Sequence, residues 1–395
     1  MTISGPCNAP DVVDVVALGE SMVTFLPSQP GRLADVPSFD RAIGGAESNL
    51  ACALAAAGHT VRWVSRVGAD AFGNHLTDTI GEYGVDVSAV HRDPARPTGI
   101  YFRTAGDRST DAHEVAYYRA GSAASAMTVD NVDPVAVRAG RILHLSGITA
   151  ALSEGCLALL RELTTRRPGR PPVSFDVNHR AGLWQDTDGP QVLLELARGA
   201  DIVFVGEDEA EEAWGVTGGP EAIREALQEP GVLVVKQGAR GATLFRHPAG
   251  SRAAGAMGVP PLERSREWGR AGADGTPQAP GCAPHPPAAT PSVEQPSTFV
   301  PALNVDVVAP TGAGDAFAAG FLSATLRGLP LSVRLRHGHL WAAATLTAPG
   351  DLAPPPTRDH ADRLAALDDD AWGRLRLGPG WTQAAQRAEE EVRTP

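Results

Sequence analysis

Short apolar runs alternate with helix-like segments along most of this chain, and this alternation constrains its fold more than any other feature. The apolar runs cover residues 12–18, 61–67, 142–145, 173–177, 202–205 and 232–236. Each has the length and composition of a strand that is buried on both faces, as strands of parallel sheets are. They are separated by helical stretches at residues 46–57, 157–166, 191–198 and 221–227. The pattern predicts an α/β fold with a mainly parallel central sheet flanked by helices.

A second texture interrupts this alternation between residues 97 and 119. The segments TGIYFRT and HEVAYYR are rich in aromatic and β-branched residues, and no helical segment separates them. Such residues favour strands, so we expect a hairpin that forms a small β lid. Three of the four tyrosines of the chain lie here, namely Tyr101, Tyr117 and Tyr118.

Residues 247–298 differ in composition from the rest of the chain. Ten prolines and seven glycines fall within this segment, and aliphatic side chains are few. Such a segment buries too little apolar surface to offset the entropy of ordering, so we expect a flexible insertion. The strand-like segments GATLFRH before it and FVPALNVDVV after it indicate that it extends a hairpin loop. We expect a disordered tail over residues 378–395.

Charge and cysteine content argue against several functions. The net charge is −12 and basic residues form no run, so we expect no nucleic-acid partner. The four cysteines are far apart and form no CxxC pair, which argues against a zinc site or a disulfide framework. Because no long apolar stretch or basic leader occurs, we expect no membrane partner and a cytoplasmic location. Lys236 is the only lysine, so it is a stronger functional candidate than any one of the arginines.

The segment VDVVAPTGAGDAFAAGFLSATLRG, residues 305–328, carries the clearest chemical signal. We expect an apolar strand that runs into Pro310, then the turn GAGD at 312–315, then a helix that ends near Gly328. The glycines permit a tight turn with outward N–H groups, and the helix N-terminus adds a positive dipole end, so the turn suits an anion. Asp315 would repel a phosphate that merely binds there. It suits a base that takes the proton from a hydroxyl attacking a phosphoryl group.

Other interpretations of this glycine-rich turn fit less well. A Walker A loop requires GxxxxGK[ST], which the segment lacks. The dinucleotide fingerprint GxGxxG fails because Phe317 occupies the position of the third glycine. A helix that is merely capped by Asp315 stays open as the non-functional alternative.

Together with a second glycine-rich segment, this turn resembles a known family. GAGDAFAAGF is similar to the C-terminal signature of the ribokinase-like (PfkB) carbohydrate kinases, and IGGAESNLACALAAAG at 43–58 is similar to their N-terminal signature. VSRVGADAFGNHLTDTIGEYGVDV, VVKQGARGATLF and LTAPGD also resemble the family, so the resemblance spans roughly residues 12–360 apart from the insertion. It implies a ribokinase-like fold, with a small β lid contributed by about residues 20–45 and 97–121.

Within that family, four segments are most similar to the 2-keto-3-deoxygluconate kinase branch: TGIYFR, YYRAGSAAS, HLSGITAALS and FDVNHRAGLW. A sugar acid needs cationic partners for its carboxylate, and Arg119 and Arg180 lie within these segments. The resemblance therefore implies an enzyme that transfers the γ-phosphoryl group of ATP, with Mg²⁺, to the 6-hydroxyl of 2-keto-3-deoxygluconate or a close sugar acid.

The resemblance also implies roles for individual residues. Asp315 would be the general base, and Arg119 and Arg180 would hold the sugar carboxylate. The other implied sugar contacts are Gly45, Ala46, Glu47, Ser48, Asn49, Tyr101, Tyr117 and Asp351. The implied ATP and anion-hole positions are Asn178, Lys236, Gly238, Arg240, Gly241, Gly312, Ala313, Gly314 and His339.

The chain departs from the family pattern at two positions. Ala309 stands where an acidic residue often precedes the turn, and Gly206 occupies the asparagine place of an NxxE pattern in which Glu209 is retained. The metal ligands therefore stay unassigned, with Glu209 as an indirect candidate. A homo-oligomer is an expectation from fold analogy alone.

Three alternatives stay open at this point. One is another sugar kinase of the family, such as a fructokinase or ribokinase, which would leave Arg119 and Arg180 without an anionic partner. Another is a non-catalytic sugar or nucleotide sensor. The departures at Ala309 and Gly206 favour it, whereas the retained Asp315 argues against it. The third assigns the insertion a docking role, although it lacks a convincing PxxP motif flanked by basic residues.

Overall fold

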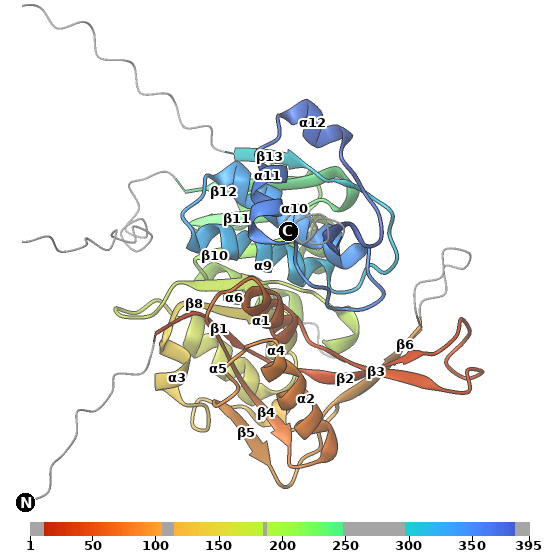
Figure 1. Ribbon diagram of the computed structural model, residues 1–395. Helices are drawn as coiled ribbons and strands as arrows, with labels where there is room; N and C mark the ends of the chain where they lie inside the picture. Colours follow the sequence, from red (N-terminus) through yellow and green to blue (C-terminus); the bar gives the residue numbers. More distant parts are fainter. Residues whose placement is uncertain (1–11, 105–113, 185–187, 248–296, 384–395) are drawn as a thin grey trace, which may run out of the picture.

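A large, mainly parallel sheet forms the centre of this computed structural model, which describes residues 12–104, 114–184, 188–247 and 297–383 (Figure 1). Within those residues its strand order is β13-β12-β11-β10-β9-β8-β1-β4-β5. Their bounds are β1 (Val13–Leu18), β4 (Val61–Gly68), β5 (Val90–Asp93), β8 (Gly140–Ser146), β9 (Val173–Asp176), β10 (Ile202–Gly206), β11 (Val232–Lys236), β12 (Gly241–Arg246) and β13 (Ser297–Pro301). Only the β11–β12 and β12–β13 pairs of this sheet are antiparallel. The predicted α/β class with a mainly parallel sheet is confirmed.

Helices cover both faces of this sheet. One face packs against α1 (Ala46–Ala56), α2 (Ala71–Glu82), α9 (Ala313–Leu326), α10 (Leu331–Leu346), α11 (Arg358–Ala365) and α12 (Asp369–Arg374). The other face packs against α3 (Pro134–Arg138), α4 (Gly147–Ala150), α5 (Glu154–Thr164), α6 (Gly189–Gly199), α7 (Glu207–Trp214) and α8 (Pro220–Ala226). Three single 3₁₀ turns complete the described helices: η1 (Ala124–Ala126), η2 (Ala181–Leu183) and η3 (Gly238–Arg240).

The apolar runs of the sequence are continuous because each central strand serves two cores. In β10, Phe204 packs into one apolar cluster with α9, while Val203 and Val205 pack into the other with α5 and α6. Successive side chains of a strand point to opposite faces, so a strand with helices on both sides has no polar face.

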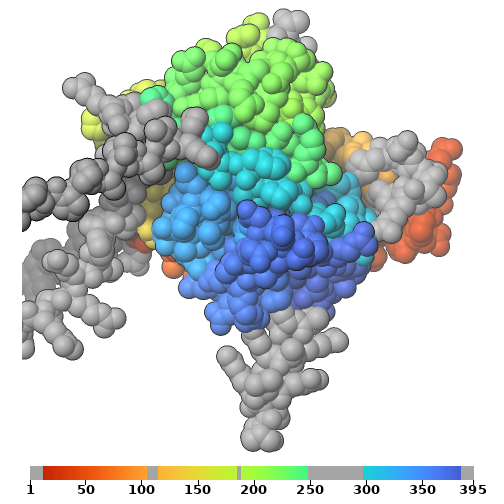
Figure 2. Space-filling model, turned by 90° about the horizontal axis from the view of Figure 1, so that it is seen from above, coloured from red at the N-terminus to blue at the C-terminus, as the bar shows by residue number. Residues whose placement is uncertain are grey.

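A separate four-stranded sheet projects to one side of the large one, in red to orange in Figures 1 and 2. Its order is β3-β2-β6-β7, with bounds β2 (Met22–Pro27), β3 (Phe39–Gly44), β6 (Ile100–Arg103) and β7 (Val115–Tyr118). Phe25 and Phe102 stack with ring centroids 4.9 Å apart, and Phe39 meets Phe102 edge-on at 5.1 Å. The predicted small β unit is thus present, built from the two expected segments.

The prediction of an apolar strand leading into Pro310 is wrong for most of that segment. Only β14 (Asn304–Val305) forms, and it pairs with β15 (Arg376–Leu377). After it, the N–H groups of Val308 and Ala309 donate to the Leu346 carbonyl oxygen at the end of α10, at 2.7 and 3.3 Å. The N–H groups of Val308 and Ala309 are therefore taken by a helix end, whereas Asp306 N–H still donates to the Leu377 carbonyl oxygen of β15, at 3.0 Å.

Several expectations concern residues outside those that the structure describes. The residues concerned are 248–296 of the insertion, 384–395 of the tail, 105–113 between β6 and β7, and Cys7 and Cys282. The flanks of the insertion are described: β12 and β13 are antiparallel neighbours, with Phe245 opposite Ser297. In the described part, Cys52 and Cys156 are free thiols. No helix in that part combines the length and apolarity needed to cross a bilayer.

Candidate active site

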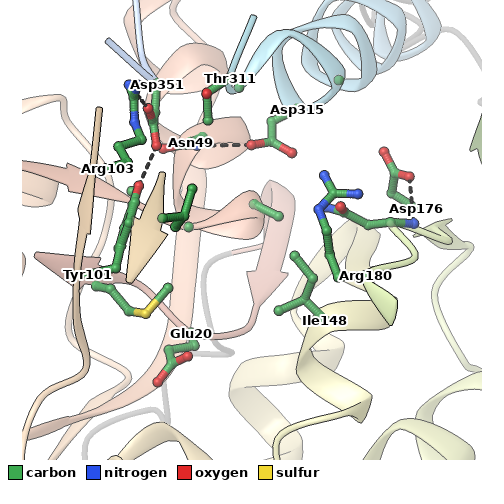
Figure 3. Close-up of a pocket in the computed structure, with 18 of the residues that line it drawn as sticks. Glu20, Asn49, Tyr101, Arg103, Ile148, Asp176, Arg180, Thr311, Asp315 and Asp351 are labelled. Carbon is green, nitrogen blue, oxygen red and sulfur yellow. Dashed lines mark hydrogen bonds and ion pairs between the residues drawn. The ribbon is translucent and has the colours of Figure 1, made fainter. Parts of the chain in front are cut away.

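A cavity of about 470 Å³ lies where the small sheet meets the carboxyl ends of the large sheet (Figure 3). Asp176 and Lys236 are the last residues of β9 and β11, and both line it. Because β9 and β11 run parallel to the same neighbour, β10, their carboxyl ends meet at one edge, where α/β sheets bind ligands. The small sheet contributes the opposite wall through Tyr101, Arg103 and Tyr117.

The turn that precedes α9 forms one end of this cavity. Gly312 is the N-cap residue, and its φ of 79° lies in the left-handed region that glycine adopts without strain. The first intrahelical bond runs from Ala316 N–H to the Gly312 carbonyl oxygen, at 3.0 Å. The N–H groups before it have no partner within the helix, and they face the end where the helix dipole is positive. Gly312 and Gly314 both line the cavity, so an anion can be bound there.

Asp315 lies in the first turn of α9 and lines the cavity. Its Oδ2 accepts a hydrogen bond of 2.9 Å from Nδ2 of Asn49, which belongs to α1 (Figure 3). Burial raises the pKa of Asp315 to about 7, and the negative charge of Asp176 adds to the increase while the Asn49 hydrogen bond opposes it. A carboxylate with a pKa near neutrality is suited to accept a proton and release it again.

Lys236 faces the same end of the cavity. Its Nζ lies 3.1 Å from both carboxylate oxygens of Asp176 and 4.0 Å from Oε2 of Glu209. Burial alone would lower the pKa of this lysine, but the two carboxylates outweigh burial and raise it. Lys236 is therefore a cation at the anion-binding turn, residues 312–315, where a Cβ added to Gly314 would lie 3.6 Å from its Nζ.

Glu209 is held by the backbone at the start of α7. Its Oε2 accepts a 2.6 Å hydrogen bond from the N–H of Gly206, and its Oε1 lies 3.5 Å from Nη1 of Arg180. The side chain of Arg180 is 55% exposed, so its guanidinium is only loosely committed to Glu209. Arg180 lines the cavity, and its Nη1 also donates a 2.7 Å hydrogen bond to the carbonyl oxygen of His179.

Arg119, the other predicted carboxylate partner, is placed differently. It forms a buried ion pair with Glu20, whose Oε1 also accepts a 2.5 Å hydrogen bond from Oγ of Ser122. Arg119 and Glu20 both line the cavity. The charge of Arg119 is therefore already matched by a carboxylate, which the sequence did not indicate.

Tyr101 and Tyr117 face each other across the β6–β7 pair, with ring centroids 5.5 Å apart. Tyr101 is buried and Tyr117 is half-exposed, and both line the cavity. Burial, reinforced by the charge of Asp351, raises the pKa of Tyr101 well above its usual value. Its hydroxyl therefore acts as a donor, and it donates to Asp351, which also lines the cavity.

The N-terminus of α1 contributes only some of its predicted residues to the cavity surface, namely Gly45, Ala46 and Asn49. Glu47 and Ser48 are buried behind it. Oε1 of Glu47 accepts a 2.7 Å hydrogen bond from Thr149, and burial raises the pKa of Glu47 to about 8. Ser48 donates a 2.9 Å hydrogen bond to Ser21. These two side chains support the helix start and do not reach the cavity.

Of the predicted nucleotide positions, too, some line the cavity and others do not. Asn178 lines the cavity, and its φ of 41° makes it the one non-glycine residue in the described ranges with a positive φ. Five other predicted positions are not among the residues that line the cavity: Gly238, Arg240, Gly241, Ala313 and His339. Arg240 is exposed and pairs with Glu207. His339 is buried, its Nε2 lies 3.2 Å from the carbonyl oxygen of Val300, and burial lowers its pKa to about 4.

Three charged residues of the cavity were missed by the sequence analysis, namely Glu20, Arg103 and Asp176. Asp176 and Glu20 could have been predicted from the sequence. Asp176 is the last residue of β9 and Glu20 follows β1 by two residues, and both of these strands end at the site. Arg103 lies two residues after Tyr101 on β6, so strand alternation places both side chains on the same face. Applying that alternation to the segment TGIYFR would have indicated Arg103.

Comparisons with known proteins match most of the chain. The model of the pfkB family of carbohydrate kinases matches residues 13–263 and 290–358. The 2-dehydro-3-deoxygluconokinase of Thermoproteus tenax is 30% identical over 361 residues, which cover 90% of this chain and 95% of that protein. The 2-dehydro-3-deoxygluconokinase of Bacillus subtilis is 31% identical over 358 residues, which cover 88% of this chain and 94% of that protein.

A solved structure gives the same result at the level of the fold. The PfkB protein of Polaromonas sp. JS666 superposes with a TM-score of 0.68 at 29% sequence identity. The superposition covers 90% of this chain and 100% of the Polaromonas chain.

Proposed function

The chain belongs to the pfkB family of carbohydrate kinases, and from this premise we propose that it phosphorylates the 6-hydroxyl of 2-keto-3-deoxygluconate or a close sugar acid, with ATP as the donor. One observation carries the proposal: Asp315 combines a pKa of about 7 with a place in the first turn of α9, beside the anion-binding turn. The names of the relatives support the choice of a sugar acid.

In the proposed reaction, Asp315 accepts the proton of the sugar hydroxyl. As that oxygen forms its bond to the γ-phosphorus, the bond from the γ-phosphorus to the β,γ-bridging oxygen breaks and ADP leaves. The proton stays on Asp315 until the product has left. Asn49 holds the carboxylate so that its second oxygen, Oδ1, is free to face the hydroxyl.

The anion-binding turn at residues 312–315, called the phosphate turn from here on, and Lys236 stabilise the negative charge that is transferred. The free N–H groups at the start of α9 point to where the γ-phosphoryl group would lie, and they need no rearrangement during the step. Lys236 supplies a positive charge at the same end. We assign Asn178 and the segment from Lys236 to Gly241 to the nucleotide side; His339 could act there only through the residues packed around it.

The residues present fit a magnesium ion that is held mainly by the phosphates. Mg²⁺ keeps several waters and uses one or two carboxylates together with substrate phosphates. Asp176 and Glu209 both line the cavity beside Lys236. In the described ranges no cluster of three or more histidine, cysteine or acidic side chains could hold a metal without a ligand's help. When bound, the ion would offset charge on the phosphates, and Asp176 and Glu209 would be the residues that help to hold it.

Recognition of the sugar acid is assigned to the arginines of the cavity. Arg180 is the better candidate for the carboxylate, because its side chain is exposed and only loosely paired. Arg119 must share its charge with Glu20, so it would bind a ligand carboxylate through the donors that Glu20 leaves free. Tyr101 and Tyr117 would pack over the sugar from the small sheet.

A coupled ADP-release assay tests the proposal. The purified full chain would be given Mg·ATP with 2-keto-3-deoxygluconate, 2-keto-3-deoxygalactonate, gluconate, fructose, ribose or adenosine, and Asp315→Asn would serve as the matched variant. We expect turnover on the keto-deoxy acids and its loss in Asp315→Asn. Turnover confined to fructose or ribose would replace the sugar acid by a neutral sugar. Silence with every acceptor would overturn the kinase and favour a non-catalytic sensor.

A further inference from the structure

Asp351 lies where the small sheet meets the phosphate turn. Its carboxylate accepts a hydrogen bond from the hydroxyl of Tyr101 and forms an ion pair with Arg103. Figure 3 shows both side chains directed at Asp351 from β6. Residues i and i+2 of a strand share a face, so one strand of the small sheet supplies both partners. All three side chains are buried.

The backbone of Asp351 packs directly on the phosphate turn. A Cβ added to Gly312 would lie 1.9 Å from the Asp351 carbonyl oxygen, so only glycine fits there. A Cβ added to Gly44, at the end of β3, would lie 2.1 Å from the Tyr101 hydroxyl and 2.8 Å from Oδ2 of Asp351. The absence of a side chain at Gly312 and Gly44 therefore lets the backbone and carboxylate of Asp351 lie directly against these two glycines.

Arg103 is the group that keeps Asp351 in this position. In the described ranges it is the one cationic side chain that pairs with the Asp351 carboxylate. Its Nη2 donates to Oδ1 of Asp351, and its buried Nε has no hydrogen-bond partner among the described residues. Removing one partner of a buried ion pair leaves an uncompensated charge, which the protein relieves by protonation or movement.

We propose that Arg103 is a positioning residue. It acts through Asp351 and keeps the phosphate turn at Gly312 in a fixed position relative to the small sheet. It fixes the anion-binding N–H groups of the turn relative to the wall that carries Tyr101 and Tyr117. The consequence for catalysis rests on the proposed kinase function, whereas the consequence for the order of the turn does not.

Amide hydrogen exchange of the full chain without ligands tests the structural consequence. The variant is Arg103→Met, and the control is Arg66→Met, which breaks a partly buried ion pair with Asp93, at 3.1 Å between β4 and β5. We expect exchange of the Ala316 amide, whose hydrogen bond to the Gly312 carbonyl oxygen closes the turn, to become about tenfold faster in Arg103→Met and to stay unchanged in Arg66→Met. Unchanged exchange in Arg103→Met, or equal acceleration in both variants, would overturn the proposal.

Steady-state kinetics test the catalytic consequence with two further variants. Arg103→Lys keeps the charge and is expected to retain more of kcat than Arg103→Met, which should lose at least about tenfold. Because the role runs through Asp351, the double variant Arg103→Met/Asp351→Asn should be no slower than Asp351→Asn alone. Additive losses would place Arg103 in direct contact with the ligand and overturn the positioning role. A wild-type chain without sugar kinase activity would overturn the proposed function, while the exchange result would still decide the coupling.

Discussion

Asn49 and Asp315 lie 266 residues apart in the chain and are joined by a 2.9 Å hydrogen bond from Nδ2 to Oδ2. The bond ties the start of α1 to the start of α9, so the two glycine-rich segments of the sequence meet at one carboxylate. It also opposes the effect of burial on the pKa of Asp315. The two helices therefore set both the orientation and the basicity of the proposed base.

The pH profile of the reaction should reflect this bond. Asp315 acts as a base only when ionised, so kcat/KM should fall as the pH drops through about 7, the raised pKa of Asp315. In Asn49→Ala the hydrogen bond that lowers this pKa is lost, and the acidic limb should move to higher pH. Ser48→Ala is the control, because Ser48 contacts Ser21 behind the cavity and should leave the limb in place. An acidic limb that does not move in Asn49→Ala would contradict this assignment.

Arg180 and Arg119 should respond differently to truncation. Arg180→Ala is expected to raise KM for the sugar acid by roughly tenfold or more with little change in Tm, because the side chain is 55% exposed and its ion pair with Glu209 is long. Arg161→Ala, at a similarly exposed arginine on α5, is the control. Arg119→Ala should also lower Tm, because it leaves Glu20 buried without its cation. A KM for the acid that Arg180→Ala leaves unchanged would remove Arg180 from the sugar site.

Gly312 is expected to tolerate no side chain. Gly312→Ala places a Cβ against the Asp351 carbonyl oxygen at a φ of 79°, so we expect a loss of about 1–3 kcal/mol in the free energy of unfolding and a large fall in kcat. Gly328→Ala is the matched control after the other end of α9, with a φ of 71° and no atom within 4 Å of the added Cβ. Denaturant unfolding gives the free energy of unfolding of both variants. The difference between them separates the destabilisation due to the contact from that due to a positive φ. Equal losses would show that the contact with Asp351 contributes nothing.

Replacing residues 248–296 by a short Gly/Ser loop should leave kinase activity largely intact. β12 and β13 pair antiparallel from Gly241 opposite Pro301 to Phe245 opposite Ser297, so a short loop can join them. The described residues that line the cavity already include the proposed base, the anion-binding turn and both arginines. The measurement is kcat and Tm of the shortened chain beside the full one. Unfolding on replacement would show that the segment is structural, and loss of a binding partner would support a docking role.

The sequence determined the local features of this protein because each depends on neighbours in the chain. The apolar runs predicted six of the nine described strands of the large sheet, the flanks of the insertion predicted β12 and β13, and β5 was not predicted. The aromatic segments around Tyr101 and Tyr117 predicted the β6–β7 hairpin of the small sheet. The glycines at 312 and 314 and the helix after them predicted an anion-binding turn. Local periodicity and turn chemistry are sufficient for such features. They failed before Pro310, where the end of α10 takes the backbone donors that a strand would have used.

Which charges neutralise one another was decided only by the tertiary structure. Arg119 meets Glu20, Arg103 meets Asp351, and Lys236 meets Asp176, each across a sequence separation that no local pattern spans. An ion pair depends on distances of a few ångströms between side chains on different elements, and the pKa of Asp315 depends on how much water those elements exclude. The sequence therefore supplied the chemical groups, whereas packing of the two sheets set their partners and their proton affinities.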